Sequence, residues 1–128
     1  MDRIKLIQAA IDATTNAYAP YSNFKVGAAL LTESGEVFQG CNIENSTYGA
    51  TICAERTAMV KAVSEGHRAF QAIAVVSVSN GNELTYPCGI CRQFLFEFMP
   101  DAEVIVSDPA CNYKVYKVSE LLPHGFKL

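Results

Sequence analysis

The sequence predicts an α/β fold: a single three-layer α/β/α domain with a mixed central sheet of about five strands. Two observations support this prediction. After an initial β-hairpin, helical and strand patterns alternate along the chain, an order that places helices on both faces of one sheet. The chain has 128 residues, of which 50% are hydrophobic, and it shows no Pro/Gly/Ser-rich stretch that would separate two domains. We therefore expect residues 1–128 to form one compact domain.

The first element is an amphipathic helix over residues 3 to 18. Its apolar stripe, at helical spacing, consists of Ile4, Ile7, Ile11 and Tyr18. Pro20 lacks a backbone N–H and ends the helix. The polar residues that follow predict a corner before the next element.

A β-hairpin follows the helix. Residues 24–31 are apolar almost throughout and predict a strand that is buried on both faces. Gly35 supplies the turn at residues 33–36, and residues 37–42 form a second, antiparallel strand. Residues 44–49 are too polar for a core and predict a loop between rigid elements, which is where proteins usually hold ligands.

The second half of the chain alternates helices with strands. The expected elements are a helix at residues 53–65 capped by Gly66, a strand at 70–79, a helix at 88–99 ended by Pro100, a strand at 104–106, an edge strand at 113–118 and a helical turn at 119–122. The packing residues of the second of these helices are expected to be Phe94, Leu95, Phe98 and Met99. No G-x-G-x-x-G or Walker motif is present, so no nucleotide cofactor is indicated.

Composition and charge narrow the classes of partner. The chain has 10 Lys and Arg against 13 Asp and Glu, and no basic cluster exceeds two residues, so we expect no nucleic-acid partner. The apolar runs are shorter than the roughly 20 residues that cross a bilayer, so no membrane partner is expected. The N-terminus does not resemble a signal peptide, and the expected location is cytoplasmic. A small-molecule substrate fits these properties best.

Three of the five cysteines form the chemical pattern of the chain. Cys53 precedes one predicted helix, and Cys88 and Cys91 form a Cys-x-x-Cys at the start of another. The partial positive charge of a helix N-terminus favours the thiolate form that metal binding requires. Three ligands leave one position open, as in catalytic rather than structural zinc sites. The sequence therefore indicates a catalytic zinc site.

Charged neighbours of these cysteines are candidates for the chemistry around the metal. Glu55 lies two residues after Cys53, where an unbound carboxylate can take a proton from a water on the metal. Three thiolates around Zn²⁺ leave a net charge of about −1, so a nearby cation is expected. Arg56 is the first candidate for a hydrogen bond to a thiolate, and Arg92 is the second; the alternative for both is a solvated surface arginine.

Other uses of the cysteines stay open at this point. A Cys-x-x-Cys is also found in thiol oxidoreductases and in structural zinc sites. A fourth ligand is available in Cys41, Cys111, His67 or His124. For the two additional cysteines we favour the interpretation of small buried hydrophobic residues, because free Cys is among the most buried residue types.

At these residues the chain resembles the cytidine deaminases of the small, three-cysteine type. Their superfamily carries the signature H-x-E followed by P-C-x-x-C, with a variant in which Cys replaces His. The matching stretches, in chain order, are Tyr21-Ser22-x-Phe24-x-Val26-Gly27-Ala28-Ala29, Asn42-Ile43-Glu44-Asn45, Cys53-Ala54-Glu55-Arg56, Pro87-Cys88-x-x-Cys91 and Leu121-Leu122-Pro123-x-x-Phe126. The chain departs from the family at Ile90, where a smaller residue is usual.

The resemblance implies a zinc-dependent hydrolysis of cytidine and 2'-deoxycytidine to uridine and 2'-deoxyuridine, with release of ammonia, in pyrimidine salvage. It implies one Zn²⁺ per subunit on Cys53, Cys88 and Cys91, with Glu55 relaying protons to N3 and then to the leaving amine. The substrate-binding residues would be Phe24, Asn42, Glu44, Tyr48, Ala54 and Phe126. Because Phe126 reaches a neighbouring subunit's site in the family, the resemblance also implies a homotetramer.

The residues themselves bear on some of these roles. Asn42 and Glu44 occupy alternate positions at the end of a predicted strand, so both can face one side and bind a sugar. This argues against a related deaminase of another aminopyrimidine, such as a nucleoside antibiotic, and the lack of basic surface argues against an RNA-editing deaminase. Phe24 begins an apolar strand, and composition alone favours the core over a stacking role.

Overall fold

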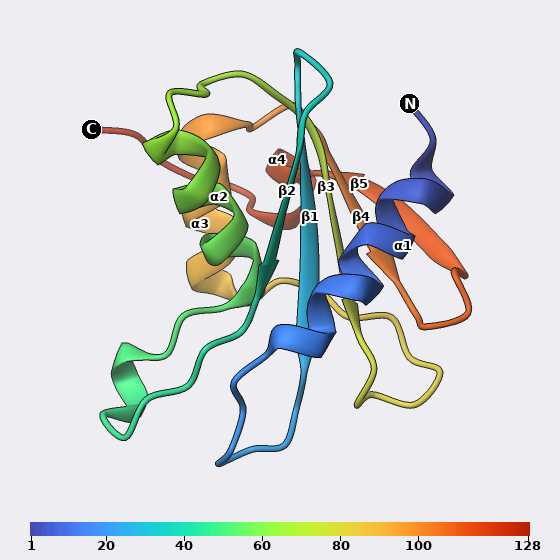
Figure 1. Ribbon diagram of the computed structural model, residues 1–128. Helices are drawn as coiled ribbons and strands as arrows, with labels where there is room; N and C mark the ends of the chain where they lie inside the picture. The colour runs from blue at the N-terminus through green and yellow to red at the C-terminus, as the bar shows by residue number, and fades with distance from the viewer.

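The computed structural model describes residues 1–128 and consists of a five-stranded sheet between two layers of helices (Figure 1). The strands are β1 (Val26–Thr32), β2 (Val37–Cys41), β3 (Phe70–Ser77), β4 (Glu103–Ser107) and β5 (Tyr113–Lys117). Their order across the sheet is β2-β1-β3-β4-β5. Strands β3 and β4 pair in parallel and all other neighbours pair antiparallel, so the sheet is mixed, as predicted.

Helices cover both faces of the sheet, and the predicted three-layer arrangement is confirmed (Figure 1). The helices are α1 (Arg3–Ala13) on one face, and α2 (Ala54–Ser64), α3 (Gly89–Phe98) and α4 (Val118–Leu121) on the other. Two short 3-10 helices, η1 (Thr14–Asn16) and η2 (Tyr48–Ala50), lie in the connections. No helix combines the length and the apolar character that spanning a bilayer requires.

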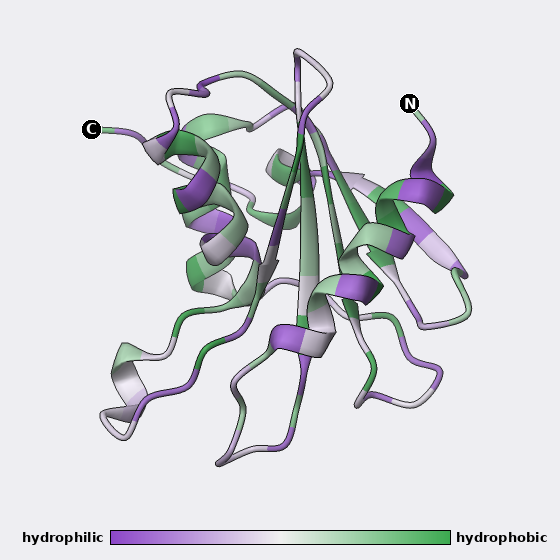
Figure 2. Ribbon diagram, viewed as in Figure 1, coloured by the Kyte–Doolittle hydropathy of each residue, from purple (hydrophilic) through white to green (hydrophobic).

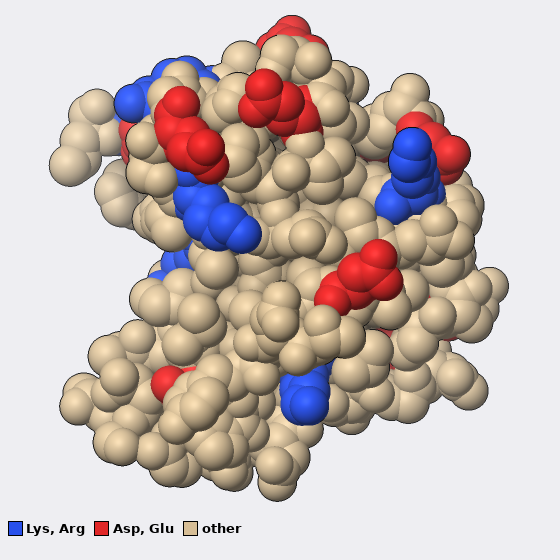
Figure 3. All heavy atoms as spheres, viewed as in Figure 1, with Lys and Arg blue, Asp and Glu red and all other residues tan.

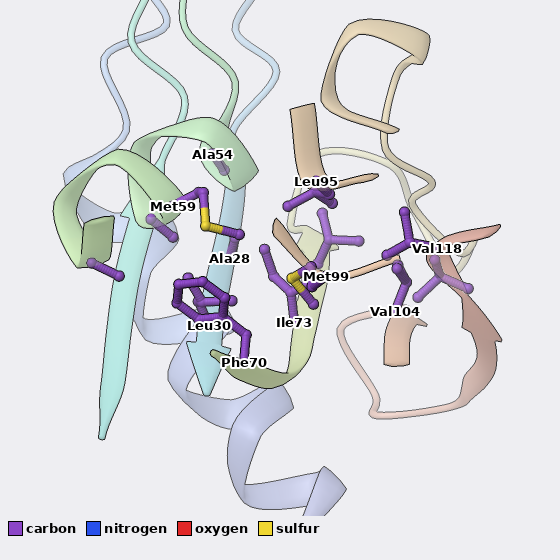
Figure 4. Packing of buried hydrophobic residues seen from close by; sticks show 14 residues of the cluster. Ala28, Leu30, Ala54, Met59, Phe70, Ile73, Leu95, Met99, Val104 and Val118 are labelled. Carbon is purple, nitrogen blue, oxygen red and sulfur yellow. The ribbon is translucent and has the colours of Figure 1, made fainter. Parts of the chain in front are cut away.

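Strand β3 shows how one sheet serves two hydrophobic clusters. Its side chains alternate, so that Ile73 and Val75 face α2 and α3, whereas Ala72 and Ala74 face α1. Figure 4 shows the larger cluster, in which Met59 of α2 and Leu95 of α3 converge with the sheet residues. The central strands are mostly hydrophobic in Figure 2, as strands buried on both faces must be.

Two glycines let the helices approach the hairpin closely. A Cβ at Gly27 would lie 1.9 Å from the carbonyl oxygen of Ala10 in α1, and one at Gly40 would lie 2.4 Å from that of Ala54 in α2. A side chain at either position would clash with backbone that cannot move aside. Gly40 therefore fixes where α2 begins, and the residues at the start of α2 belong to the site described below.

The first helix differs from its prediction in length and in the face that it buries. It gives way to η1 after Ala13, and Tyr18 pairs with the Ile43 segment in an isolated bridge. Ile4 and Tyr18 are 40% and 55% exposed, whereas Leu6, Ile7 and Ala10 are buried. The predicted apolar stripe was therefore wrong, because the buried face is centred on a neighbouring side of the helix. That side packs against the small residues of β1 and β3, which let the helix lie close to the sheet.

The four predicted packing residues of helix α3 and its C-terminus all contact the core. Leu95 and Met99 are buried, and Phe94 and Phe98 are half-buried and pack against the same cluster, while Cys91 is a further buried position that was not predicted. The two rings pack on each other with centroids 5.8 Å apart. The outer face of this helix therefore remains apolar and partly open to solvent.

Three irregular segments meet at one end of the sheet. Residues 17–25, 42–53 and 78–88 lie where β3 ends and where α2 and α3 begin, in the lower part of Figure 1. On the face shown in Figure 3, acidic and basic side chains are interspersed and form no continuous basic area. This end of the sheet carries the candidate functional site.

Candidate metal centre and substrate cavity

The side chains of Cys53, Cys88 and Cys91 form one cluster, the thiol centre. Cys53 is the N-cap of α2, Cys88 is the N-cap of α3, and neither side chain caps its helix. Cysteine is a poor choice for an N-cap, where Ser, Thr, Asp or Asn would bond the first turn, so its presence at both positions points to another role. The three Sγ atoms lie within 4.8 Å of one another, and no other Cys, His, Asp or Glu joins them.

The geometry of the thiol centre fits zinc. Two Zn–S bonds of about 2.3 Å at a tetrahedral angle hold the sulfurs roughly 3.8 Å apart. Cys53 Sγ and Cys88 Sγ are 3.8 Å apart. Cys41 and Cys111 lie elsewhere as free, half-buried thiols, so the chain brings together three ligands and not the closed set of four.

The protonation of the thiols shows that the thiol centre suits a cation. The hydrogen bond from Cys91, together with Arg56 and Cys88, lowers the pKa of Cys53 to about 5. The same bond to Cys53, and burial, raise the pKa of Cys91, because a second thiolate beside the first is unfavourable. A divalent cation compensates this repulsion and allows all three sulfurs to bind as thiolates.

The two arginines that follow the cysteines have different partners. Arg56 Nη2 is 3.4 Å from Cys53 Sγ and 3.5 Å from the carbonyl oxygen of Thr51. The guanidinium of Arg92 donates to the carbonyl oxygens of Pro87 at 2.8 Å and Leu121 at 2.9 Å, and makes no hydrogen bond to a sulfur. Arg92, the second candidate for a bond to a thiolate, therefore does not make one. Arg92 instead ties the segment before α3 to the end of α4.

Glu55 lies in the first turn of α2 and is 4% exposed. Burial is the main reason that its pKa rises to about 7, and the negative charge of Cys53 adds to the effect. A carboxyl group with a pKa near neutrality can both accept and release a proton at physiological pH, as general acid–base catalysis requires. The carboxyl group faces the same cavity as Cys53 and Cys88.

A cavity of about 300 Å³ opens beside the thiol centre. Five of the six predicted substrate-binding residues line it: Phe24, Asn42, Glu44, Tyr48 and Ala54. Phe24 is 37% exposed, so it is not a core residue as composition alone suggested. Ala54 opens α2, and its backbone N–H is one of the first-turn donors that have no partner within the helix.

Asn42 and Glu44 face the cavity and also hold the neighbouring backbone. The Asn42 amide donates to the carbonyl oxygen of Phe24 at 2.7 Å and accepts from the N–H of Val26 at 2.9 Å. The Glu44 carboxylate accepts from the N–H groups of Tyr21 and Ser22 and from the Ser22 hydroxyl. The Ser22 hydroxyl is the main cause that lowers the pKa of Glu44, which therefore stays ionised at neutral pH.

Some cavity residues were not predicted. The additional lining side chains are Ser22, Val26, Thr51, Thr85 and Tyr86. Thr85 and Tyr86 directly precede the Pro-Cys-x-x-Cys motif, so their proximity to Cys88 was a usable signal. The hydroxyl of Tyr86 lies 3.0 Å from that of Tyr116 on β5, a pairing that nothing in the sequence indicated.

Phe126, the sixth predicted substrate-binding residue, does not line the cavity of its own chain. Its backbone is held by the Gln93 side chain, whose amide donates to the carbonyl oxygen of Phe126 at 2.8 Å. Phe126 is 62% exposed and lies on the outer face of α3, beside Ile90. An apolar groove of about 640 Å³ lies there, lined by Gly89, Ile90, Gln93, Phe94, Glu97, Phe98, Phe126 and Leu128.

The chain is similar to known proteins over most of its length. The model of the cytidine and deoxycytidylate deaminase zinc-binding region matches residues 1–107. A cytidine deaminase of Halalkalibacterium halodurans is 50% identical over 127 residues, which are 98% of this chain and 95% of the relative. The crystal structure of cytidine deaminase from Burkholderia pseudomallei has a TM-score of 0.93 at 48% identity, covering 98% of this chain and all of the other. A blasticidin-S deaminase of Bacillus cereus is 31% identical over 94% of this chain and 89% of the relative.

Proposed function

We propose the following reaction for this chain, which belongs to the family of zinc-binding cytidine and deoxycytidylate deaminases. It hydrolyses cytidine and 2'-deoxycytidine to uridine and 2'-deoxyuridine with release of ammonia. The observation that carries this conclusion is a cluster of three thiols, two of which, Cys53 and Cys88, line one cavity together with the buried Glu55 carboxyl. A closed structural zinc site requires no such carboxyl group, and a thiol oxidoreductase requires no third cysteine.

The residues divide the chemistry among them. Cys53, Cys88 and Cys91 would hold a zinc ion, which would supply a Lewis acid able to make water a nucleophile near neutral pH. Glu55 takes a proton from the attacking water and gives it to N3 of the pyrimidine as oxygen adds to C4. Glu55 then carries the remaining proton of that water, now on the C4 hydroxyl, to the exocyclic nitrogen, and the C4–N bond breaks to give the C4 carbonyl and ammonia. One water is consumed for each nucleoside. Arg56 offsets negative charge on Cys53.

We infer that the remaining cavity residues bind the nucleoside. Phe24 offers an aromatic face to the base, and Tyr48 encloses the cavity from the loop that follows Glu44. Asn42 and Glu44 each retain hydrogen-bonding capacity for sugar hydroxyls, and the N–H of Ala54 can bind the polar edge of the base. Recognition of a sugar supports cytidine over other aminopyrimidines, as does the higher identity to cytidine deaminases than to a blasticidin-S deaminase.

We also propose that the active protein is a homotetramer in which Phe126 completes a neighbouring subunit's site. The exposed apolar face of α3 supports an association between copies, because exposed groups such as Ile90 and Phe126 are costly in water. The Gln93 side chain bonds the backbone of Phe126, whose side chain lies at the groove on α3 and not at the cavity of its own chain. Each subunit of this tetramer would be one domain formed by residues 1–128.

A reducing compartment suits a site of three free thiols, so we propose that the protein acts in the cytoplasm, in pyrimidine salvage. Small nucleosides fit a cavity of this volume, and no nucleic-acid or membrane partner is proposed.

The decisive experiment is a spectrophotometric assay of the purified, zinc-loaded protein with cytidine and with 2'-deoxycytidine. We expect both substrates to lose the absorbance of the aminopyrimidine as ammonia accumulates in equal amount. The Glu55→Gln variant is the matched control for contaminating activity. Absence of turnover of both nucleosides by protein that holds one zinc per chain would overturn the proposed function.

A further inference from the structure

Residues 21–26, which we call the recognition segment, are held in an unusual way. Residues 21–25 are exposed and belong to no helix or strand, so burial does not fix them. Five of the six backbone N–H groups in the segment donate to side-chain oxygens: Tyr21 and Ser22 to Glu44, Phe24 to Ser22, Lys25 to Ser79, and Val26 to Asn42. The position of the Phe24 ring therefore depends on polar side chains.

Glu44 has little spare capacity after these bonds are made. Its Oε1 accepts from the N–H of Tyr21 at 2.9 Å and from that of Ser22 at 3.1 Å, and its Oε2 accepts from the Ser22 hydroxyl. A carboxylate offers about four acceptor sites, so one site, on Oε2, remains for a ligand in the cavity. The Ser22 hydroxyl occupies the other site of that oxygen and so determines the direction of the free one.

The same hydroxyl also reaches the backbone of Phe24. A serine Oγ has one hydrogen to donate and lone pairs to accept. The hydrogen goes to the Glu44 carboxylate, and a lone pair accepts the N–H of Phe24 at 3.0 Å. Ser22 is therefore the one residue whose side chain bonds both the carboxylate and the chain that carries the aromatic ring, and it lines the cavity between them.

We propose that Ser22 is a positioning residue for nucleoside binding: its hydroxyl couples the orientation of the Glu44 carboxylate to the position of the Phe24 ring. The inference rests on the proposed function, in which these two groups bind the sugar and the base. Ser22 itself takes no part in the chemical step. Its loss loosens both halves of the nucleoside site at once, and leaves the thiol centre and Glu55 in place.

The test is steady-state kinetics of Ser22→Ala, with Ser22→Thr and Ser46→Ala as matched variants. A hydrogen bond to a charged group commonly changes binding about 10-fold or more, so we expect the KM for cytidine to rise by about that factor in Ser22→Ala while kcat changes less than about threefold. Ser22→Thr keeps the hydroxyl and should restore KM. Ser46 bonds the Tyr21 hydroxyl at 2.7 Å and not Glu44, so Ser46→Ala should resemble the wild type.

Two further measurements separate this inference from others. If the hydroxyl acts through Glu44, the double variant Ser22→Ala/Glu44→Gln should have a KM close to that of Glu44→Gln alone. Amide hydrogen exchange at Phe24 should accelerate in Ser22→Ala, which reports the coupling without turnover. An active wild type with unchanged KM in Ser22→Ala, a failure of Ser22→Thr to restore KM, or multiplicative effects in the double variant would each overturn the inference. An inactive zinc-loaded wild type would instead overturn the proposed function.

Discussion

The thiol centre and the recognition segment line the same cavity but are built differently. Cys53 and Cys88 stand at the N-termini of two helices whose inner faces lie in the core, and Cys91 is itself buried. The recognition segment has no such support, and four of its six N–H groups are bound by side chains from other parts of the chain. Packing positions the groups that we propose to carry the reaction, whereas hydrogen bonds position the groups that we propose to bind the substrate.

This difference implies different consequences of mutation. Packed elements have few alternative arrangements, so a change at the thiol centre should remove a ligand or a proton carrier and leave the rest in place. Hydrogen-bonded loops open at low free-energy cost, so a change in the recognition segment should alter affinity. We therefore expect effects on metal content and kcat at the first region and on KM at the second.

The largest effect is expected from removing a metal ligand. Cys88→Ala leaves two sulfurs, and zinc should fall from about one equivalent per chain to near zero, with activity below detection. Cys88 is exposed, so the change opens no cavity in the core. Metal analysis after gel filtration measures the loss, and Cys41→Ala, which removes a cysteine outside the cluster, is the control. Full zinc occupancy in Cys88→Ala would contradict the assignment of the ligands.

The next largest effect is expected from Glu55→Gln. Loss of a general acid–base group should lower kcat by at least about 10²-fold while zinc stays bound, because the three sulfurs are unchanged. Burial raises the pKa of Glu55 to about 7, so ionising it above that pH disfavours the folded state. The neutral Gln lacks this penalty, and the variant should be at least as stable as the wild type at pH 8. A Glu55→Gln variant with wild-type kcat would remove Glu55 from the proton relay.

The same difference explains what the sequence could predict. The thiol centre was predictable because its signals are local: a cysteine before each helix, a second cysteine three residues on, and a carboxylate in the first turn. Alternating helices and strands likewise predicted the mixed sheet and both helix layers, which the structure confirms. Local patterns failed for the buried face of α1, because that face depends on the small residues of the sheet beneath it.

Contacts between distant segments were out of reach. Arg56 and Arg92 each follow a motif position, but the carbonyl oxygen of Leu121, 29 residues away, binds Arg92. Ser22 likewise meets Glu44 across 22 residues, and the sequence placed it in a polar corner and in a matching stretch without indicating this partner. Side-chain hydrogen bonds of this kind have no periodicity, so spacing cannot reveal them.

A smaller effect is expected from Phe126→Ala, which tests whether the nucleoside site of one chain includes Phe126 of another chain. Loss of one aromatic contact should raise KM for cytidine about 2- to 10-fold and leave kcat nearly unchanged. The decisive step is to mix this variant with Glu55→Gln and let subunits exchange. Sites that combine Glu55 of one chain with Phe126 of another should regain the wild-type KM. If mixing restores nothing although hybrid oligomers form, the ring acts within its own chain or not at all.

The smallest effect is expected in the pH dependence of stability, where Glu44→Gln separates the two regions. Hydrogen bonds led by that from Ser22 hold the pKa of Glu44 below its ordinary value of 4.5. The ionised carboxylate therefore stabilises the folded protein fully above about pH 4.5, and this contribution is lost as the pH falls through the lowered pKa. In thermal unfolding, the Tm of the wild type should exceed that of Glu44→Gln by a constant difference from pH 7 to pH 5. This difference in Tm should shrink below pH 5. Zinc loss at low pH affects both proteins alike and cancels in the comparison. A difference in Tm that does not depend on pH would mean that packing, and not the charge of Glu44, holds the recognition segment.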